Sequence, residues 1–385
     1  MGESMTEKTA NGEYAWLLED HGTAGDARTL FQIANRLAAA GDDRLAATAF
    51  DRAFAVDPDD EEIALARAVH LDGLAVEDHG LRFCYVPAGT FLMGSMDGEP
   101  DERPVRPVRL GDYWLSETAV SWATFCDVLG WEPAPVSTPP QELERKDAFM
   151  LHQGNKIRRQ YCEDGTRRAR DWHAHAPDAR YTSGAGGPTL SAVSLFGSPD
   201  RGGSQRPWTY DGKPMVSVAW DQAAAMCAAM STGAVQYRLP TEAEWEHAAR
   251  GGFSGRRRPW GDEPPTPELC DFDRFDAFAI RPMRALPPNG YGLFGMAGSV
   301  WEWTADWYDA EYYQHGPADN PRGPESGEHR VLRGGSWADC ADVQTVSFRM
   351  SRSPDMSRST PGHTRGMRSY MAANIGFRIC RTAAV

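Results

Sequence analysis

The sequence has no C-x-x-C pair, although seven of its 385 residues are cysteines. This absence excludes the usual zinc-ribbon and thioredoxin-type motifs, whose thiols come in such pairs. An odd number of scattered cysteines in a chain without a secretory signal is typical of buried thiols in a reducing compartment. We therefore expect most of the cysteines to be structural.

Long apolar runs and a surplus of positive charge are missing as well. No apolar window is long enough to span a bilayer, and the N-terminal segment lacks the basic and apolar regions of a secretory signal. The formal net charge of −14 disfavours non-specific binding to nucleic acid or to anionic membranes. We expect a cytoplasmic protein with no nucleic-acid or membrane partner.

Tryptophan, glycine and proline are abundant, and the composition changes along the chain. Hydrophobic residues make up 41% of the sequence, and its 13 tryptophans predict a large core. An Ala-rich part gives way to a Gly-, Pro- and aromatic-rich part near residues 77–80. We predict a polar lead over residues 1–25, a helical region over 26–78 and a main domain over 80–385. A long insertion, at about 131–213, interrupts the main domain.

Apolar spacing predicts three helices in the helical region. Leu30, Ile33 and Leu37 recur with a helical period, and a second apolar stripe and a third helix follow. The region resembles one tetratricopeptide-type helical pair in the spacing of Ala34, Ala46, Phe50, Ala53 and Pro58. Because one such pair cannot bury its own face, it is either a cap on the main domain or a docking point for a protein partner.

Short strands and a few helices are predicted in the main domain. Strands are expected at 83–87, 89–95, 105–110, 113–115, 214–220 and 374–380. Helices are expected after Ser121, over residues 221–232 and after Thr241. Thr241 and Glu244 have the spacing of a capping box, which marks the start of the last of these helices.

Residues 333–340, with the sequence RGGSWADC, contain the main candidate site. Gly334 and Gly335 have no Cβ, so they allow the backbone to pass tightly under a packed ring. An acid and a thiol, Asp339 and Cys340, follow closely. Ser336 is also a candidate, although no His–Asp relay accompanies it in the sequence.

Seven stretches of the chain together resemble the formylglycine-generating enzymes, also called sulfatase-modifying factors. They lie in the family's order at 89–95, 214–227, 238–250, 259–261, 289–303, 333–337 and 376–378. The resemblance implies a loop-rich α+β fold related to C-type lectins, here preceded by a small α-helical region. The short predicted strands and abundant Gly, Pro and Trp agree with that fold.

The resemblance also implies an oxidase site, from which this sequence departs. Aerobic members of the family oxidise a substrate cysteine to formylglycine, using two cysteines that bind copper(I). Those cysteines lie two and seven residues beyond the aromatic of the Gly-Gly-Ser-aromatic motif. Asp339 and Gln344 stand at these positions here, and Cys340 is one residue late. Standard formylglycine generation is therefore not expected.

Three functions remain open. The leading hypothesis is an atypical oxidase-type enzyme that acts on a peptide or a small metabolite and uses copper or iron. Its catalytic candidates are Asp339, Cys340, Gln344 and Ser336. The alternatives are a non-catalytic peptide- or ligand-binding module and a scaffold docked through its helical region.

Substrate binding is predicted for four side chains: Trp337, Arg349, Arg352 and His363. The two arginines resemble family arginines that face the substrate groove, where a guanidinium can bind a carboxylate or backbone carbonyls. Ion pairs with the chain's excess acids are the alternative for both arginines. His363 could also be a metal ligand next to Asp339 and Gln344.

Metal binding is predicted at three places, with Ser299, Glu302, Asp271, Asp273, His173 and His175 as candidate ligands. The first two lie where the family holds a structural calcium ion, although asparagine is usual at the first position. The two aspartates form either a second oxygen-rich site or a solvated acidic loop. The two histidines, two positions apart, could reach one metal ion from an extended segment.

Cys227 and Cys380 match, or nearly match, positions that form a disulfide in secreted relatives. The resemblance therefore implies that these two thiols lie near each other. In a reducing compartment we expect them to remain unbonded.

Overall fold

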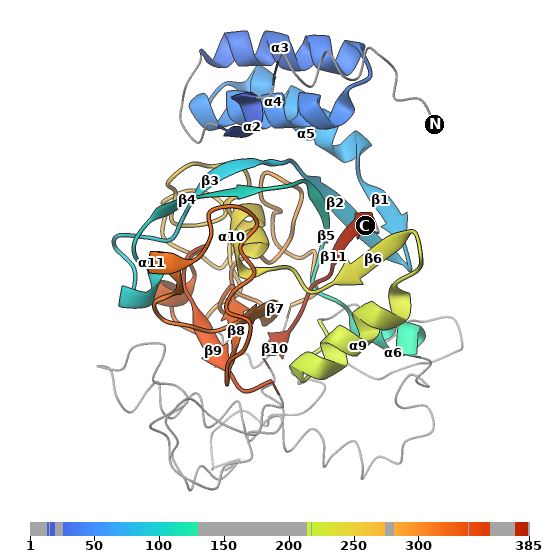
Figure 1. Cartoon of the computed structure of the whole chain (residues 1–385), viewed down its shortest axis with the longest axis vertical. Coiled ribbons are helices and arrows are strands. Elements are labelled where there is room, and N and C mark those ends of the chain that lie inside the picture. Colours follow the sequence, from blue (N-terminus) through green and yellow to red (C-terminus); the bar gives the residue numbers. More distant parts are fainter. Residues whose placement is uncertain are drawn as a thin grey trace, which may run out of the picture.

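A layer of helices lies on one side of a strand-rich domain in this computed structural model (Figure 1). The structure describes residue 14 and residues 16–19, 26–129, 214–216, 218–273, 281–337, 339–354 and 374–383. The layer contains α2 (Trp16–Glu19), α3 (Ala27–Ala39), α4 (Asp43–Val56) and α5 (Glu61–Gly73). An α+β fold preceded by a small helical region is the architecture that the sequence predicts.

Two helices of this layer, α3 and α5, begin at capping side chains. Asp26 precedes α3, and its carboxylate accepts a hydrogen bond from the backbone N–H of Thr29 at 3.0 Å. Asp60 accepts from the backbone of Glu62 and Ile63 at the start of α5. The apolar stripes of α3 and α4 are buried against each other, which confirms the predicted helices. The likeness to a tetratricopeptide pair stays a prediction.

The main domain contains three sheets in its described part. The five-stranded sheet has the order β1 (Val76–Asp78), β2 (Leu81–Val86), β5 (Tyr113–Ser116), β11 (Cys380–Ala383), β6 (Val235–Arg238). The four-stranded sheet has the order β10 (Ile375–Gly376), β7 (Trp301–Trp307), β8 (Arg330–Arg333), β9 (Met350–Arg352). The third sheet pairs β3 (Gly89–Met93) with β4 (Arg106–Leu110).

Short helices connect and cover these sheets. They are α6 (Trp122–Leu129), α9 (Trp220–Met230), α10 (Glu242–Arg250) and α11 (Tyr312–His315), with 3-10 turns η1 (Pro100–Glu102) and η3 (Ala341–Val343). None of the described helices has the length and apolar character of a membrane span.

Two predicted strands are wrong in detail. Of the described residues in 214–220, only Pro214 makes a bridge, to Ser121. Met215, Val216 and Val218 are nevertheless buried, so the apolar run signals burial and not strand pairing. The stretch 374–380 is divided, because β10 joins the four-stranded sheet and β11 joins the five-stranded sheet. This segment therefore connects the two larger sheets.

Helix α10 lies at the centre of the domain, and every one of its residues is buried. The side chain of Thr241 accepts a hydrogen bond from the backbone of Glu244 at 3.2 Å, and the Glu244 carboxylate accepts from the backbone of Thr241 at 2.8 Å. This reciprocal pair is the predicted capping box. The helix ends at Gly251, whose φ of 61° is left-handed and therefore favours glycine.

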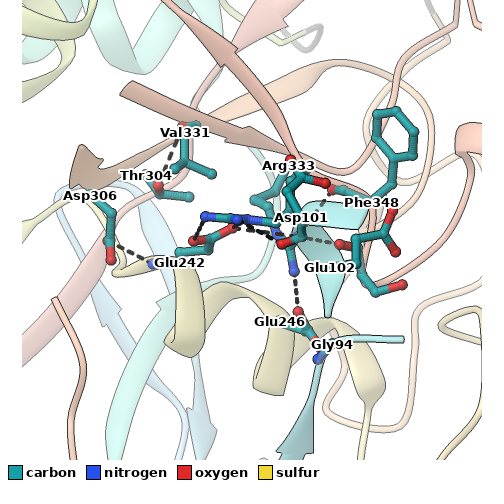
Figure 2. A network of polar contacts seen from close by, with 12 residues as sticks. Gly94, Asp101, Glu102, Glu242, Glu246, Thr304, Asp306, Val331, Arg333 and Phe348 are labelled. Atoms are coloured by element: carbon teal, nitrogen blue, oxygen red, sulfur yellow. Dashed lines mark hydrogen bonds and ion pairs between the residues drawn. The ribbon is translucent and has the colours of Figure 1, made fainter. Parts of the chain in front are cut away.

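Charged side chains of α10 are paired with arginines from distant parts of the chain. Glu242 accepts two hydrogen bonds from the Arg349 guanidinium, at 2.6 and 3.0 Å. Glu246 accepts from Arg333 and, at 2.6 Å, from Arg250. Figure 2 shows Arg333 reaching Glu246 within this network. Because these charges are buried, each one needs its partner, and the pairing fixes α10 against β8.

One arginine of α5 connects the helical layer to the main domain. Arg67 is only 2% exposed, and it donates to the Asp51 carboxylate at 2.6 and 2.9 Å. The same guanidinium donates to the backbone oxygens of Gly290 at 2.8 Å and of Gly251 at 3.1 Å. The Tyr291 hydroxyl donates to the other Asp51 oxygen at 2.8 Å. The helical layer is therefore packed on the main domain as a cap.

We predict that Arg67→Ala lowers the free energy of unfolding by about 3 kcal/mol, because it leaves a largely buried carboxylate and two carbonyls without their donor. The matched control is Arg44→Ala in α4. Arg44 is 60% exposed and pairs with Asp112 at 3.2 Å, also across to the main domain. Its loss should cost less than about 1 kcal/mol. Urea unfolding of both variants checks this, and equal losses would contradict the role given to Arg67.

A second prediction concerns acid stability and His247. The ring centre of this buried α10 side chain lies 4.9 Å from that of Phe91, and its Nδ1 atom has no hydrogen-bond partner among the described residues. Burial is the largest cause that lowers its pKa from 6.5 to about 4. The unfolded chain therefore binds the proton first, and His247 should cost up to about 3 kcal/mol of stability as the pH falls from about 6.5 to about 4. Unfolding measured across this range should show a weaker pH dependence for His247→Phe, and an unchanged dependence would refute the assignment.

Candidate functional site

The backbone after β8 passes tightly under other side chains, as the two glycines predict. Gly334 has a φ of 99°, and a Cβ there would lie 3.0 Å from the ring of Trp245. Gly335 has a φ of 70°, and a Cβ there would lie 2.6 Å from the side-chain oxygen of Gln344. Both the left-handed backbone and the close approach require glycine. The tight turn brings Ser336 against Gln344.

Four buried polar residues form what we call the Ser336 cluster: Ser336, Asp339, Gln344 and Asn374. The Ser336 hydroxyl donates to the Asp339 carboxyl at 2.5 Å, and the Asn374 amide donates to the Ser336 hydroxyl at 2.9 Å. The Gln344 amide donates to the backbone oxygen of Ser336 at 3.2 Å. All four residues are at most 1% exposed. The structure thus brings three of the predicted catalytic candidates together.

Asn374 is a member of the cluster that the sequence prediction omits. It directly precedes β10 and lies two residues before the Gly376-Phe377-Arg378 stretch. Its side-chain oxygen is buried and has no partner among the residues that the structure describes. Its position next to this family stretch is the sequence signal that could have identified Asn374 as a candidate.

Burial raises the pKa of Asp339 well above its usual range, although hydrogen bonds from Ser336 and from the Trp301 side chain oppose the shift. The cluster therefore favours a neutral carboxyl group next to a hydroxyl and two amides.

Two thiols lie near the cluster. Cys340 is half-buried and directly precedes η3. Cys270 is 1% exposed, and its sulfur lies 3.8 Å from the Gln344 side-chain oxygen and 3.3 Å from the backbone oxygen of Ala297. Burial raises the pKa of Cys270, which favours the protonated thiol. The sequence prediction missed Cys270 because it lies 74 residues away from Gln344.

The cluster does not fit a copper(I) ion bound by two thiolates. Copper(I) prefers soft sulfur ligands, whereas Asp339 and Gln344 offer a buried carboxyl and an amide. Within the described ranges, no group of three or more His, Cys, Asp or Glu side chains is placed to hold a metal ion.

Both arginines predicted to bind substrate are buried, and their substrate-binding roles stay predictions. Arg349 is 1% exposed and bound to Glu242, and it also donates to the backbone oxygen of Asp101 at 2.8 Å. The ion-pair alternative therefore describes Arg349. Arg352 is 6% exposed, and burial lowers its pKa to about 10. Trp337 is fully buried in the core. His363 lies outside the described residues.

The predicted calcium site at Ser299 and Glu302 is not supported by the contacts of the carboxylate. Glu302 accepts hydrogen bonds from Arg378 at 2.6 and 2.8 Å and from the indole of Trp245 at 2.7 Å. Both of its oxygens are thus used by protein donors. Ser299 has a φ of 62° and bonds through its backbone to Asp271 and Trp337.

Of the remaining metal candidates, Asp271 and Asp273 belong to the residues that the structure describes. The Asp271 carboxylate is buried and pairs with Arg281 at 3.5 Å. The backbone N–H of Asp273 donates to the backbone oxygen of Asp339 at 2.8 Å, so this segment supports the cluster. The Arg281 guanidinium is thus a charge partner of Asp271, and the metal site at these two aspartates stays a prediction. His173 and His175 lie outside the described residues.

Cys227 and Cys380 are both buried and unbonded in the structure. Burial is the largest cause that raises the pKa of Cys380, and Glu244 and Cys227 add to it. The effect of Cys227 on Cys380 is consistent with the proximity that the family resemblance implies.

The main domain is similar in sequence to a known protein family. Residues 76–383 match the model of the Sulfatase-modifying factor enzyme 1-like domain. The formylglycine-generating enzyme of Streptomyces coelicolor is 34% identical over 322 residues, which cover 77% of this chain and 88% of that protein. The mouse protein named Inactive C-alpha-formylglycine-generating enzyme 2 is 30% identical over 309 residues, covering 72% and 83%.

Solved structures show the same fold at lower identity. The Treponema denticola variable protein 1 aligns with a TM-score of 0.50 and 21% identity, covering 80% of this chain and 97% of that one. PvdO from Pseudomonas aeruginosa aligns with the same score and identity and the same coverage. At this identity the likeness concerns the fold alone.

We predict that Asp339→Asn does not destabilise the protein at about pH 8. A raised pKa in the folded state means that the carboxyl contributes stability at low pH, which is lost as the pH rises through the folded pKa. Asparagine is neutral at every pH, so the variant should gain on the wild type between about pH 5 and about pH 8. Urea unfolding at both pH values measures the difference. A difference between the variant and the wild type that stays constant over this range would show that Asp339 is already ionised in the folded protein at pH 5, and would contradict the prediction.

Proposed function

This chain belongs to the sulfatase-modifying factor family, and we propose that it is a ligand-binding member that does not perform copper-dependent oxidation. The observation that carries the proposal is the Ser336 cluster. A carboxyl and an amide stand where two thiolates would hold copper(I), and both are at most 1% exposed.

The contacts within the cluster support a structural and not a chemical role for its members. Ser336, Asp339 and Gln344 are joined by internal hydrogen bonds, and burial favours the neutral form of the acid. A general base or a metal ligand needs a carboxylate that is ionised and can be reached. The ligand would be a peptide or a small molecule. The similarity to a mouse protein that is named inactive supports a member of the family without oxidase activity.

An atypical oxidase is the second candidate, and one observation favours it. The Cys270 sulfur lies beside Gln344, and Cys340 follows Asp339 in the sequence. A thiol supplied by a different segment could act in place of the missing cysteine. In that case the activity should depend on Cys270 or Cys340.

Copper(I) binding and dioxygen uptake separate the two candidates. We expect the purified protein to bind no copper(I) in competition with a copper(I) chelator, and to consume no dioxygen with a cysteine-containing peptide. Asp339→Cys/Gln344→Cys should gain copper(I) binding, because it restores both soft ligands on an intact framework.

Single variants serve as controls for this experiment. Cys270→Ser and Cys340→Ser should leave the wild-type result unchanged. Metal-dependent dioxygen uptake by the wild type that is lost in either variant would overturn the proposal and establish the oxidase.

A further inference from the structure

A cavity of about 690 Å³ lies between α9, β6 and the first residue of β8. This volume is within the range of small-molecule sites in proteins. Its walls include Trp220, Ala224 and Ala228 of α9, Arg238 of β6 and Arg330 of β8. None of these residues belongs to the Ser336 cluster. Figure 1 shows α9 beneath β6 at the edge of the five-stranded sheet.

Arg330 is held rigidly in this wall. Its guanidinium carbon lies 3.8 Å from the ring centre of Trp220 and 3.5 Å from that of Trp307, so the group is sandwiched between two indoles. One guanidinium nitrogen donates to the backbone oxygen of Ala305 at 2.5 Å. Trp220 is itself fixed, because its indole N–H donates to the backbone oxygen of Thr304 at 2.7 Å. The cation is therefore presented in one orientation.

Arg330 has no carboxylate partner in the described part of the chain. Among the residues that the structure describes, no ion pair within 4.0 Å includes Arg330, and its buried Nε atom has no acceptor. Burial lowers its pKa to about 10, so it remains charged at neutral pH, and Asp306 is the acidic group that opposes the shift. The Asp306 carboxylate instead accepts a hydrogen bond from the backbone N–H of Glu242 at 2.7 Å.

The other charge on the cavity wall is already balanced. Arg238 donates to both oxygens of Glu244, at 2.6 and 2.7 Å. Among the described wall residues there is no aspartate or glutamate. In a chain with a net charge of −14, a cavity with one unbalanced cation and no wall carboxylate is a specific feature of this surface.

We propose that this cavity binds a monoanionic carboxylate with an apolar or aromatic body. The carboxylate pairs with the Arg330 guanidinium, and the body lies against Trp220 and the small side chains of Ala224 and Ala228. A guanidinium binds a carboxylate through parallel N–H donors. A phosphate group carries more charge and needs more donors than one unbalanced arginine provides. The proposal does not depend on the copper test, since the two sites share no residue.

Binding of phenylacetate to the full-length protein tests this proposal, with phenylacetamide as the neutral match and inorganic phosphate as the competing anion. Calorimetric titration should show phenylacetate binding at least about tenfold more tightly than the other two probes, because one fully formed ion pair accounts for that difference. Arg330→Gln should reduce phenylacetate binding to the level of the amide. Arg256→Gln is the matched control, since Arg256 is an exposed arginine already paired with Asp262 at 2.5 Å, and it should bind as the wild type does.

A second variant keeps the test decisive if Arg330→Gln does not fold. Ala228→Leu fills the cavity from an exposed position on α9 without altering charge, and it should also abolish binding. Equal binding of the acid and the amide, unchanged binding by the variants, or no binding of phenylacetate would each overturn the proposal. Tighter binding of phosphate than of phenylacetate would overturn the assignment to a carboxylate.

Discussion

The structure depends on one buried helix, α10, and on the arginines that pair with its carboxylates. Moving charges out of water is unfavourable unless each charge is paired and hydrogen-bonded. Glu242 and Glu246 meet this condition through Arg349 and Arg333, which are at most 1% exposed. These pairs can form in only one arrangement of α10 and β8. The position of β8 in turn fixes the start of the Gly334-Gly335 turn and therefore the place of the Ser336 cluster.

Framework and chemistry are separable in this domain. The ion pairs, the capping box and the two glycines position the loop after β8, and none of them requires a particular group at positions 339 or 344. Those two positions can change while the fold is kept. In this chain they hold a carboxyl and an amide, and both groups form hydrogen bonds with Ser336. The family fold is thus present without the soft ligands that its oxidase chemistry needs.

The sequence was sufficient for the parts of the account that depend on local patterns. The capping box of Thr241, the helices of the N-terminal layer and the close approach at Gly334 follow from residues near one another in the chain. The family resemblance supplied the fold and the two altered positions. Local patterns could not assign partners to Arg349 or Glu302, because those partners lie 107 and 76 residues away. The same limit hid Cys270, and the apolar run at 214–220 could not distinguish a buried segment from a strand.

The protonation state of Asp339 is the central point of this account, because an ionised carboxylate there would be available to a metal ion or a substrate. It is measured most directly by the infrared difference spectrum between the wild type and Asp339→Asn at neutral pH. The account predicts that the wild type has the carbonyl stretch of a protonated carboxyl group, which the variant lacks. A difference spectrum with only the bands of an ionised carboxylate would contradict it.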